Sequence, residues 1–170
     1  MTKLIQELYG NGTINEAKMA ELQAEMATTG QTEEEIILKK NIIDEGSLFN
    51  IKSTLIKTPL IRPKTEEIPL EVLGLISEEA AVNYKMIPLF KKDDVVGIGM
   101  VYPEDILAQN ALRFLSRKEN FTYEIYLVTF SDLNNVLKQH RTLNRETKKA
   151  LTELGKENDL LWRLPADQKF

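Results

Sequence analysis

Two prolines, Pro59 and Pro63, stand in the segment 57–64 and separate two stretches of different hydrophobic pattern. Proline lacks a backbone N–H, fixes its own φ and restricts the residue before it, so a continuous helix or strand cannot cross this segment. Before it the periodicity is helical only; after it helical and strand patterns alternate. We therefore expect a helical unit over 1–55, an extended linker over 56–69 and a second unit over 70–142.

Residues 1–55 contain a weak internal repeat, which appears when the sequence is aligned with itself at an offset of 29. Each copy has an apolar pair, a Gly or Asn suited to a left-handed helix stop, an isoleucine, an N-capping residue and an amphipathic run. The stops are Gly12 and Asn41, and the caps are Asn15 and Asp44. Each copy predicts a helix-turn-helix hairpin, and two hairpins can bury their apolar stripes against each other. Chance similarity between amphipathic helices is the alternative.

Residues 70–142 predict a small sheet with helices on it. Apolar runs at 86–90 and 95–102 form a hairpin, and 121–129 alternates as a third strand. The 104–118 segment has helical spacing, with an inward stripe of Ile106, Leu107, Ala111, Leu112 and Leu115. The fold class is α+β: N-terminal helical hairpins followed by a small three-stranded sheet covered by helices.

Capping residues mark two further helices in this part. Ser77 is the expected cap of a helix that begins at 78, and Ser131 or Asp132 that of the last helix. Residues 143–170 continue as a mostly polar helix and tail. That helix is either a connector towards a downstream region or a helix packed back on the domain.

Composition excludes several classes of protein. The chain has a net charge of −4 and 7% aromatic residues, so a surface that binds nucleic acid is not expected. It has no cysteine, which removes disulfides, zinc-thiolate sites and cysteine catalysis. No run of about 18 apolar residues occurs, and the first residues show no signal peptide. We expect a cytoplasmic protein without direct membrane insertion.

The candidate catalytic groups are few. His140 lies between cations and is interpreted as a solvated histidine in the last turn of a helix. No Gly-x-x-x-x-Gly-Lys-Ser/Thr loop is present. The Gly97-Ile98-Gly99 run lacks the third glycine of a dinucleotide loop, and close packing or a bulge within a strand is the favoured interpretation. We expect no enzyme activity, no catalytic or metal-binding residues and no cofactor.

An ordered series of short signals runs through the second part: 69–73, 76–81, 84–89 (Tyr-Lys-Met-Ile-Pro-Leu), the strand pair, and 103–105 (Pro-Glu-Asp). This series resembles the N-terminal domain of the assembly ATPases of type II secretion and type IV pili. In that family a helix ends in tyrosine, a strand opens with proline-leucine, and a hydrophobic strand runs into a proline and an acidic residue. The resemblance covers about 56–142.

Members of this family often carry tandem Arg-Leu-Gly, Leu-Val, Gly, Ile, Leu patterns before that domain, in some cases binding cyclic di-GMP. The resemblance places the degenerate ligand motif on Lys3, Leu4, Leu8, Gly12 and Ile14. Lysine replaces the arginine, whose planar fork it cannot copy, and Ile5 replaces the glycine. The second copy reads Thr32-Glu33-Glu34, whose carboxylates would repel phosphate. Weak or absent binding of cyclic di-GMP is expected.

The resemblance implies a non-catalytic N-terminal interaction domain that docks the motor to the cytoplasmic domain of an inner-membrane platform protein. The chain would then be peripheral to the inner membrane through its partners, with a P-loop ATPase region downstream. Formation of homo-oligomers would depend on that missing region. The alternatives are a cyclic di-GMP-sensing domain, or a stand-alone adaptor that lacks a motor.

Overall fold

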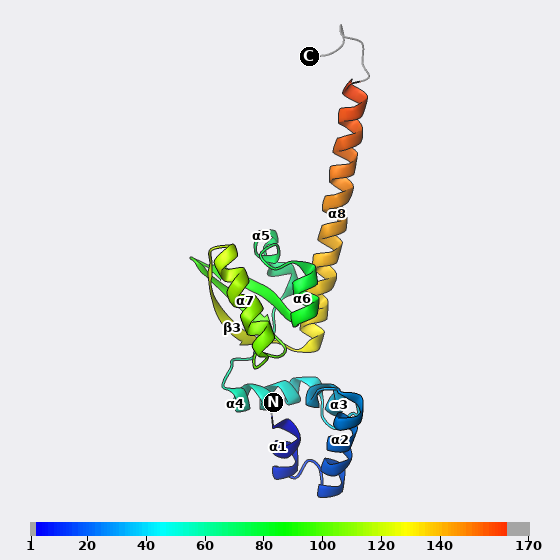
Figure 1. Cartoon of the computed structure of the whole chain (residues 1–170), viewed down its shortest axis with the longest axis vertical. Coiled ribbons are helices and arrows are strands. Elements are labelled where there is room, and N and C mark those ends of the chain that lie inside the picture. Colours follow the sequence, from blue (N-terminus) through cyan, green and yellow to red (C-terminus); the bar gives the residue numbers. More distant parts are fainter. Residues whose placement is uncertain (1–2, 163–170) are drawn as a thin grey trace.

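The computed structural model describes residues 3–162 (Figure 1). Four helices come first: α1 (Leu4–Gly10), α2 (Glu16–Thr29), α3 (Glu33–Lys39) and α4 (Glu45–Ile56). In Figure 1 they form the lower part of the molecule, with α4 and α3 next to the sheet-containing part above and α1 below α4. N-terminal helices therefore precede the sheet, as expected.

Local capping defines the two hairpins. The side chains of Asn15 and Asp44 accept hydrogen bonds from the backbone N–H groups of Lys18 and Ser47, which confirms both predicted caps. The turns between the paired helices contain Gly12 at φ +81° and Asn41 at φ +52°, both in the left-handed region. The two copies of the sequence repeat therefore form two hairpins with equivalent caps and turns.

The helices of this part enclose their own apolar cluster, which we call the helical core. Its buried members come from α1 to α4 and from the turn before α2: Leu4, Ile5, Leu8, Ile14, Leu22, Ile36, Ile37 and Leu48. Burying such side chains is worth about 1.5–3 kcal/mol each relative to exposing them. The apolar positions of the repeat thus hold the hairpins together.

The second part is built around a three-stranded mixed sheet. After the short helices η1 (Thr65–Glu67), α5 (Leu70–Leu73) and α6 (Glu78–Tyr84), β1 (Met86–Lys92) pairs antiparallel with β2 (Val95–Met100). Helix α7 (Ile106–Lys118) then crosses over to β3 (Thr122–Leu127), which pairs parallel with β2. Ser77 caps α6 as predicted, since its hydroxyl accepts from the N–H of Ala80.

Helix α7 covers the sheet through a narrower face than the sequence suggested. Leu112 is fully buried in the core of this part, the sheet core, as predicted. Ile106 and Leu107 are instead 70% and 71% exposed, so that part of the predicted stripe is wrong. Helix α7 packs on the sheet core through Ala108 and Leu112, so the two exposed side chains of its first turn face away from the core.

The glycines of β2 allow close packing. A Cβ on Gly99 would lie 2.6 Å from Cγ1 of Val128, and one on Gly97 would collide with the ring of Phe90. Real Cβ atoms essentially never approach neighbours so closely, so any other residue at either position would force Val128 or Phe90 to shift. The packing interpretation of the Gly97-Ile98-Gly99 run is confirmed.

The segment around Pro59 joins the sheet. Leu60 forms an isolated parallel bridge to Leu127, with the N–H of Leu127 donating to the Pro59 carbonyl at 2.8 Å and that of Ile61 to the Leu127 carbonyl at 2.9 Å. The extended conformation agrees with the sequence expectation. The division into 1–55, 56–69, 70–142 and 143–170 as separate folding units stays a prediction.

The last helix, α8 (Phe130–Trp162), begins on the sheet part and projects far beyond it (Figure 1). Its cap is Thr129, whose hydroxyl accepts from the N–H of Asp132, rather than Ser131 or Asp132. Leu151 and Leu154 are exposed, so this stretch of the helix does not pack back on the domain. Residues 163–170, including Pro165 of the predicted tail, lie outside the described residues.

His140 is a buried residue of α8, and its interpretation as a solvated helix-end histidine is wrong. The helix continues for several turns beyond it, and α6 packs beside it. Its Nε2 lies 3.2 Å from the Ile76 carbonyl, which can only accept, so Nε2 carries the proton. Nδ1 then accepts from the amide of Asn144 at 3.1 Å. The ring is a structural link between α8 and the chain before α6.

Within the described residues, no helix combines the length and the apolarity needed to cross a membrane.

Candidate ligand cleft and the junction between the two cores

The N-termini of α1 and α3 meet at the surface of the helical part. The backbone N–H of Leu4 donates to Oε2 of Glu33 at 2.8 Å, and both residues occupy the same position in their copies of the repeat, 29 residues apart. The first N–H groups of a helix have no partner inside it and carry partial positive charge. Glu33 therefore supplies from α3 the cap that Lys3 does not give α1.

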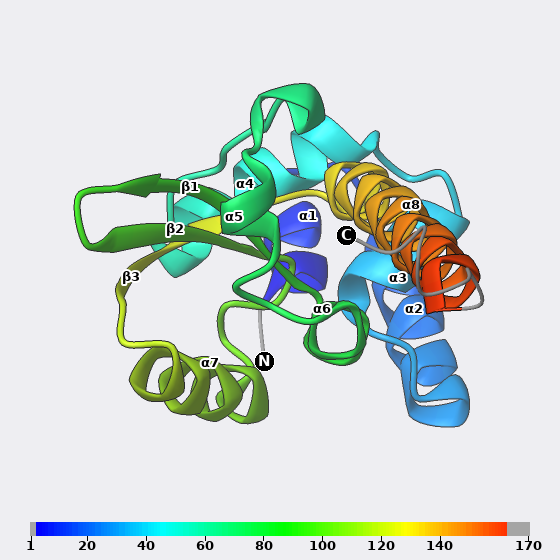
Figure 2. The same cartoon turned by 90° about the horizontal axis from the view of Figure 1, so that it is seen from above.

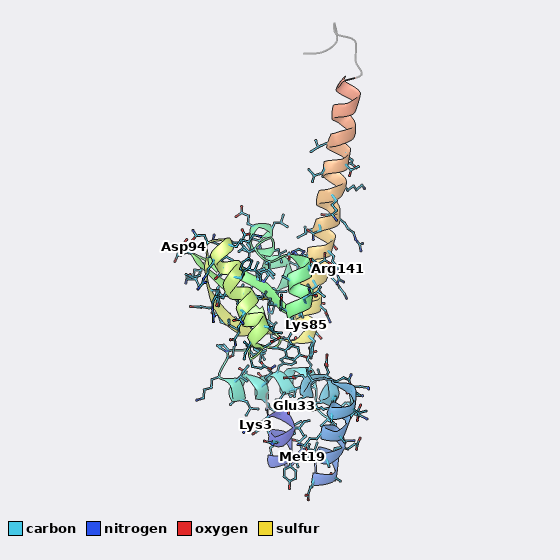
Figure 3. All side chains as sticks on the ribbon, viewed as in Figure 1. Lys3, Met19, Glu33, Lys85, Asp94 and Arg141 are labelled. Atoms are coloured by element: carbon cyan, nitrogen blue, oxygen red, sulfur yellow. The ribbon has the colours of Figure 1, made fainter. Side chains whose placement is uncertain are left out.

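A cleft of about 550 Å³ opens beside this contact. It lies among α1, α2 and the start of α3, and it is lined by Lys3, Gln6, Gln23, Met26, Ala27, Gly30, Gln31 and Glu33. Figure 3 labels Lys3 and Glu33 on this part of the molecule. The side-chain oxygen of Gln31 is buried and has no hydrogen-bond partner among the described residues. Amide groups, one cation and one carboxylate are thus the polar groups of the cleft.

The five residues of the predicted ligand motif lie in different places. Lys3 is exposed and lines the cleft. Leu4, Leu8 and Ile14 are buried in the helical core, and Gly12 is at the exposed turn between α1 and α2. The structure brings only Lys3 to the cleft, so the other four positions serve the hairpin itself. Whether Lys3 binds a ligand stays a prediction.

Glu33 and Glu34, expected to repel phosphate together, point to different surroundings. Glu33 lines the cleft, whereas Oε1 of Glu34 lies 2.8 Å from Nζ of Lys52 in the interior. Only the Glu33 carboxylate is in place to repel an anion in the cleft.

Lys52 is the centre of a buried junction between the helical core and the sheet core. Its side chain, on α4, is 0% exposed. Besides Glu34 of α3, its ammonium group contacts Oε1 of Glu104 at 2.9 Å and donates to the carbonyl of Val101 at 2.8 Å. Helices α3 and α4 of the helical part and the segment after β2 in the sheet part therefore meet at one cation.

Aromatic rings complete this junction. The Lys52 ammonium lies 4.8 Å from the centre of the Tyr102 ring, close enough for a cation–π interaction. Phe130 contacts the rings of Phe49 and Tyr102 edge-on. The hydroxyls of Tyr102 and Thr32, the cap of α3, share a hydrogen bond of 2.9 Å. Burial raises the pKa of the Tyr102 hydroxyl well above its ordinary value, so the ring stays neutral.

Sequence reasoning did not identify this junction. Lys52 follows Leu48 by four residues and Phe49 by three, so it lies on the apolar stripe of its helix. A cation inside an apolar stripe is the signal that could have found it. Its carboxylate partners could not have been named, because Glu34 and Glu104 are far from it in sequence.

The fold is that of the N-terminal domain of type II secretion and type IV pilus assembly ATPases. The sequence profile of the MshEN domain matches residues 56–146, and the chain belongs to the MshEN domain family. Domains of this family are non-catalytic. The resemblance seen in the sequence is confirmed.

Solved structures show the same fold. The structure of MshE with cdg (cyclic di-GMP) has a TM-score of 0.66 at 19% identity and covers 82% of this chain and 99% of that one. The N-terminal domain of XpsE has a TM-score of 0.60 at 13% identity, over 80% of this chain and 92% of that one. No curated protein sequence matches the chain. Because both structural similarities extend beyond the 56–146 profile match, they include helices of the N-terminal part.

Proposed function

We propose that this chain docks the motor of a type II secretion or type IV pilus assembly ATPase to the cytoplasmic domain of an inner-membrane platform protein. It would lie on the cytoplasmic side of the membrane and associate with it only through that partner. Its own assembly into homo-oligomers would depend on the ATPase region. The family supports the position of the domain before a motor.

The observation that carries the proposal is the carboxylate of Glu33 at the N-terminus of α1. Helix N-termini bind phosphate through free N–H groups and partial positive charge. Here the N–H of Leu4 already donates to a carboxylate that also lines the cleft. A phosphate would have to displace that carboxylate and then lie next to it. This favours protein contact over nucleotide sensing as the function of the domain.

Cyclic di-GMP sensing is the second candidate, supported by the likeness to MshE with cdg and by two polar groups of the cleft: Lys3 and the side-chain oxygen of Gln31, which has no partner among the described residues. Titration calorimetry separates the two candidates. We expect no binding tighter than a Kd of about 10 µM, or roughly −7 kcal/mol.

A charge-neutral variant tests the physical reason. Glu33→Gln keeps a hydrogen-bond acceptor for Leu4 and removes the negative charge, so it should strengthen any residual binding of cyclic di-GMP. Glu7→Gln, an exposed residue of α1 outside the cleft, makes the same change in charge and should have no effect. Submicromolar binding by the unmodified chain, lost in Lys3→Ala, would instead establish a sensor.

A further inference from the structure

The outer surface of α7 carries apolar side chains without a partner in the described chain. Ile106, Leu107 and Phe114 are 70%, 71% and 67% exposed, while Ala108 and Leu112 on the opposite side of the same helix are fully buried. Figure 2 shows α7 at the periphery of the molecule, with nothing packed on its outer side. Isolated exposed apolar residues are ordinary, whereas apolar side chains gathered on one surface are typical of interaction sites.

Cations accompany these side chains. Arg113, Arg117 and Lys118 are exposed, and none of them forms an ion pair within the described residues. No Asp or Glu occurs from Ile106 to Lys118; Asp105 and Glu119 flank the helix, and Asp105 is engaged as its cap. Several other exposed cations do have carboxylate partners, as Lys18 has in Glu21 and Arg141 has in Glu78. In a chain of net charge −4, α7 is a local basic surface.

Helical geometry arranges the six side chains in two adjacent rows, which we call the α7 outer face. One row is Ile106, Arg113 and Arg117, and the other is Leu107, Phe114 and Lys118, with spacings of seven and four residues in each. Within each row the apolar groups therefore precede the cations. The helix dipole accounts for basic residues in the last turn, but not for Arg113 or for the exposed apolar groups.

We infer that the α7 outer face docks an acidic amphipathic helix of the platform protein, in which apolar residues are followed by carboxylates one turn apart. Arg113 and Arg117 are themselves one turn apart, and a guanidinium pairs with a carboxylate through two parallel hydrogen bonds. Phenylalanine and arginine are also enriched at protein interfaces. This inference rests on the proposed function and names the surface and the partner chemistry for it.

The arrangement favours a protein partner over an anionic membrane. A helix that lies in a membrane interface presents a continuous apolar face along its length, with cations on its polar side. Helix α7 already buries one face in the sheet core, and its exposed apolar groups stop at Phe114 where the cations continue.

Charge-reversed variants of the full chain test the inference by titration with the purified cytoplasmic domain of the platform protein. Arg113→Glu/Arg117→Glu should weaken binding about tenfold or more. The control Lys91→Glu/Lys92→Glu makes the same change in net charge on two exposed cations of β1 that have no ion pair within the described part of the chain, and it should leave affinity within about twofold of the unmodified chain. Arg113→Gln/Arg117→Gln, which does not oppose the helix dipole, should also weaken binding, and circular dichroism checks that each variant is folded.

A second matched pair of variants tests the apolar side chains of the α7 outer face. Ile106→Ser/Phe114→Ser should weaken binding, whereas Leu151→Ser/Leu154→Ser on the projecting part of α8 should not. Phosphatidylcholine vesicles with and without phosphatidylglycerol test the membrane alternative on the same proteins.

Each result is decisive. If the unmodified chain does not bind the platform domain, the proposed function fails and this inference fails with it. Binding that both arginine variants leave unchanged overturns the α7 outer face alone, as does an equal loss in the Lys91/Lys92 control. Arginine-dependent binding to anionic vesicles without arginine-dependent binding to the platform domain would assign the face to lipid and overturn the inference.

Discussion

The helical part and the sheet part keep different features of their family. In the sheet part the profile match runs through the whole of 56–146. In the helical part the apolar positions and caps of the repeat are present, but the arginine-glycine positions are occupied by Lys3, Ile5 and Thr32-Glu33-Glu34. The comparison shows that the apolar positions that form the hairpins can be kept while the arginine-glycine positions change, even where a replacement such as Ile5 itself joins the helical core.

The largest expected effect comes from the junction that joins the two parts. Lys52→Met leaves the carboxylates of Glu34 and Glu104 without their buried cation, so we expect a loss of about 3–5 kcal/mol in the free energy of unfolding. Urea denaturation followed by circular dichroism measures it. The unfolding transition should also become broader or biphasic, because the two cores lose their main polar connection.

The exposed Lys64 provides the control. Its side chain is 74% exposed and forms an ion pair with the exposed Glu67, so Lys64→Met should change stability by less than about 1 kcal/mol. A Lys52→Met chain as stable as this control would mean that the junction contributes little to the contact between the two parts.

A cavity in the sheet core tests whether the two parts unfold separately. Leu112→Ala should cost about 2–5 kcal/mol, because the side chain is fully buried. Hydrogen exchange followed by mass spectrometry should show faster exchange in β1 to β3 and unchanged protection in α1 to α3. Leu8→Ala, in the helical core, should give the opposite pattern. Equal loss of protection in both parts with either variant would contradict two separate folding units.

A smaller effect is expected in the sheet itself. Gly99→Ala places a methyl group 2.6 Å from Val128 and 3.2 Å from Leu89, and such overpacking costs about 1–3 kcal/mol. Gly155→Ala on the exposed helix α8 meets no atom within 4 Å and should stabilise the chain by up to about 1 kcal/mol. The midpoints of thermal unfolding compare the two. An unchanged unfolding midpoint in Gly99→Ala would show that Val128 and Leu89 can shift to accept the methyl group at little cost.

The sequence predicted what depends on near neighbours. Asn15 and Asp44 are caps because their side chains reach N–H groups three residues away. The predictions were wrong where contacts between residues far apart in the sequence determine whether a side chain is buried. The exposure of Ile106 and Leu107 depends on how the crossover helix sits on the sheet, and the burial of His140 depends on α6 packing beside α8.

The candidate site was predicted in part. Lys3 was named and lines the cleft, but Leu4 and Leu8 are core residues that no ligand can reach without opening the hairpin. The role of Glu33 as the cap of α1 could not be foreseen, because it depends on the two repeat copies meeting at their equivalent positions.

The continuous helix α8 has a mechanical consequence. His140, Asn144 and the Arg141–Glu78 ion pair fasten its first half to the domain, and the helix then runs on without a break to Trp162. At 1.5 Å per residue the part beyond Asn144 is a lever of about 27 Å. A tilt of about 10° at its base therefore displaces the far end by about 5 Å. Small rotations of the sheet part become displacements as large as a full helical turn at Trp162.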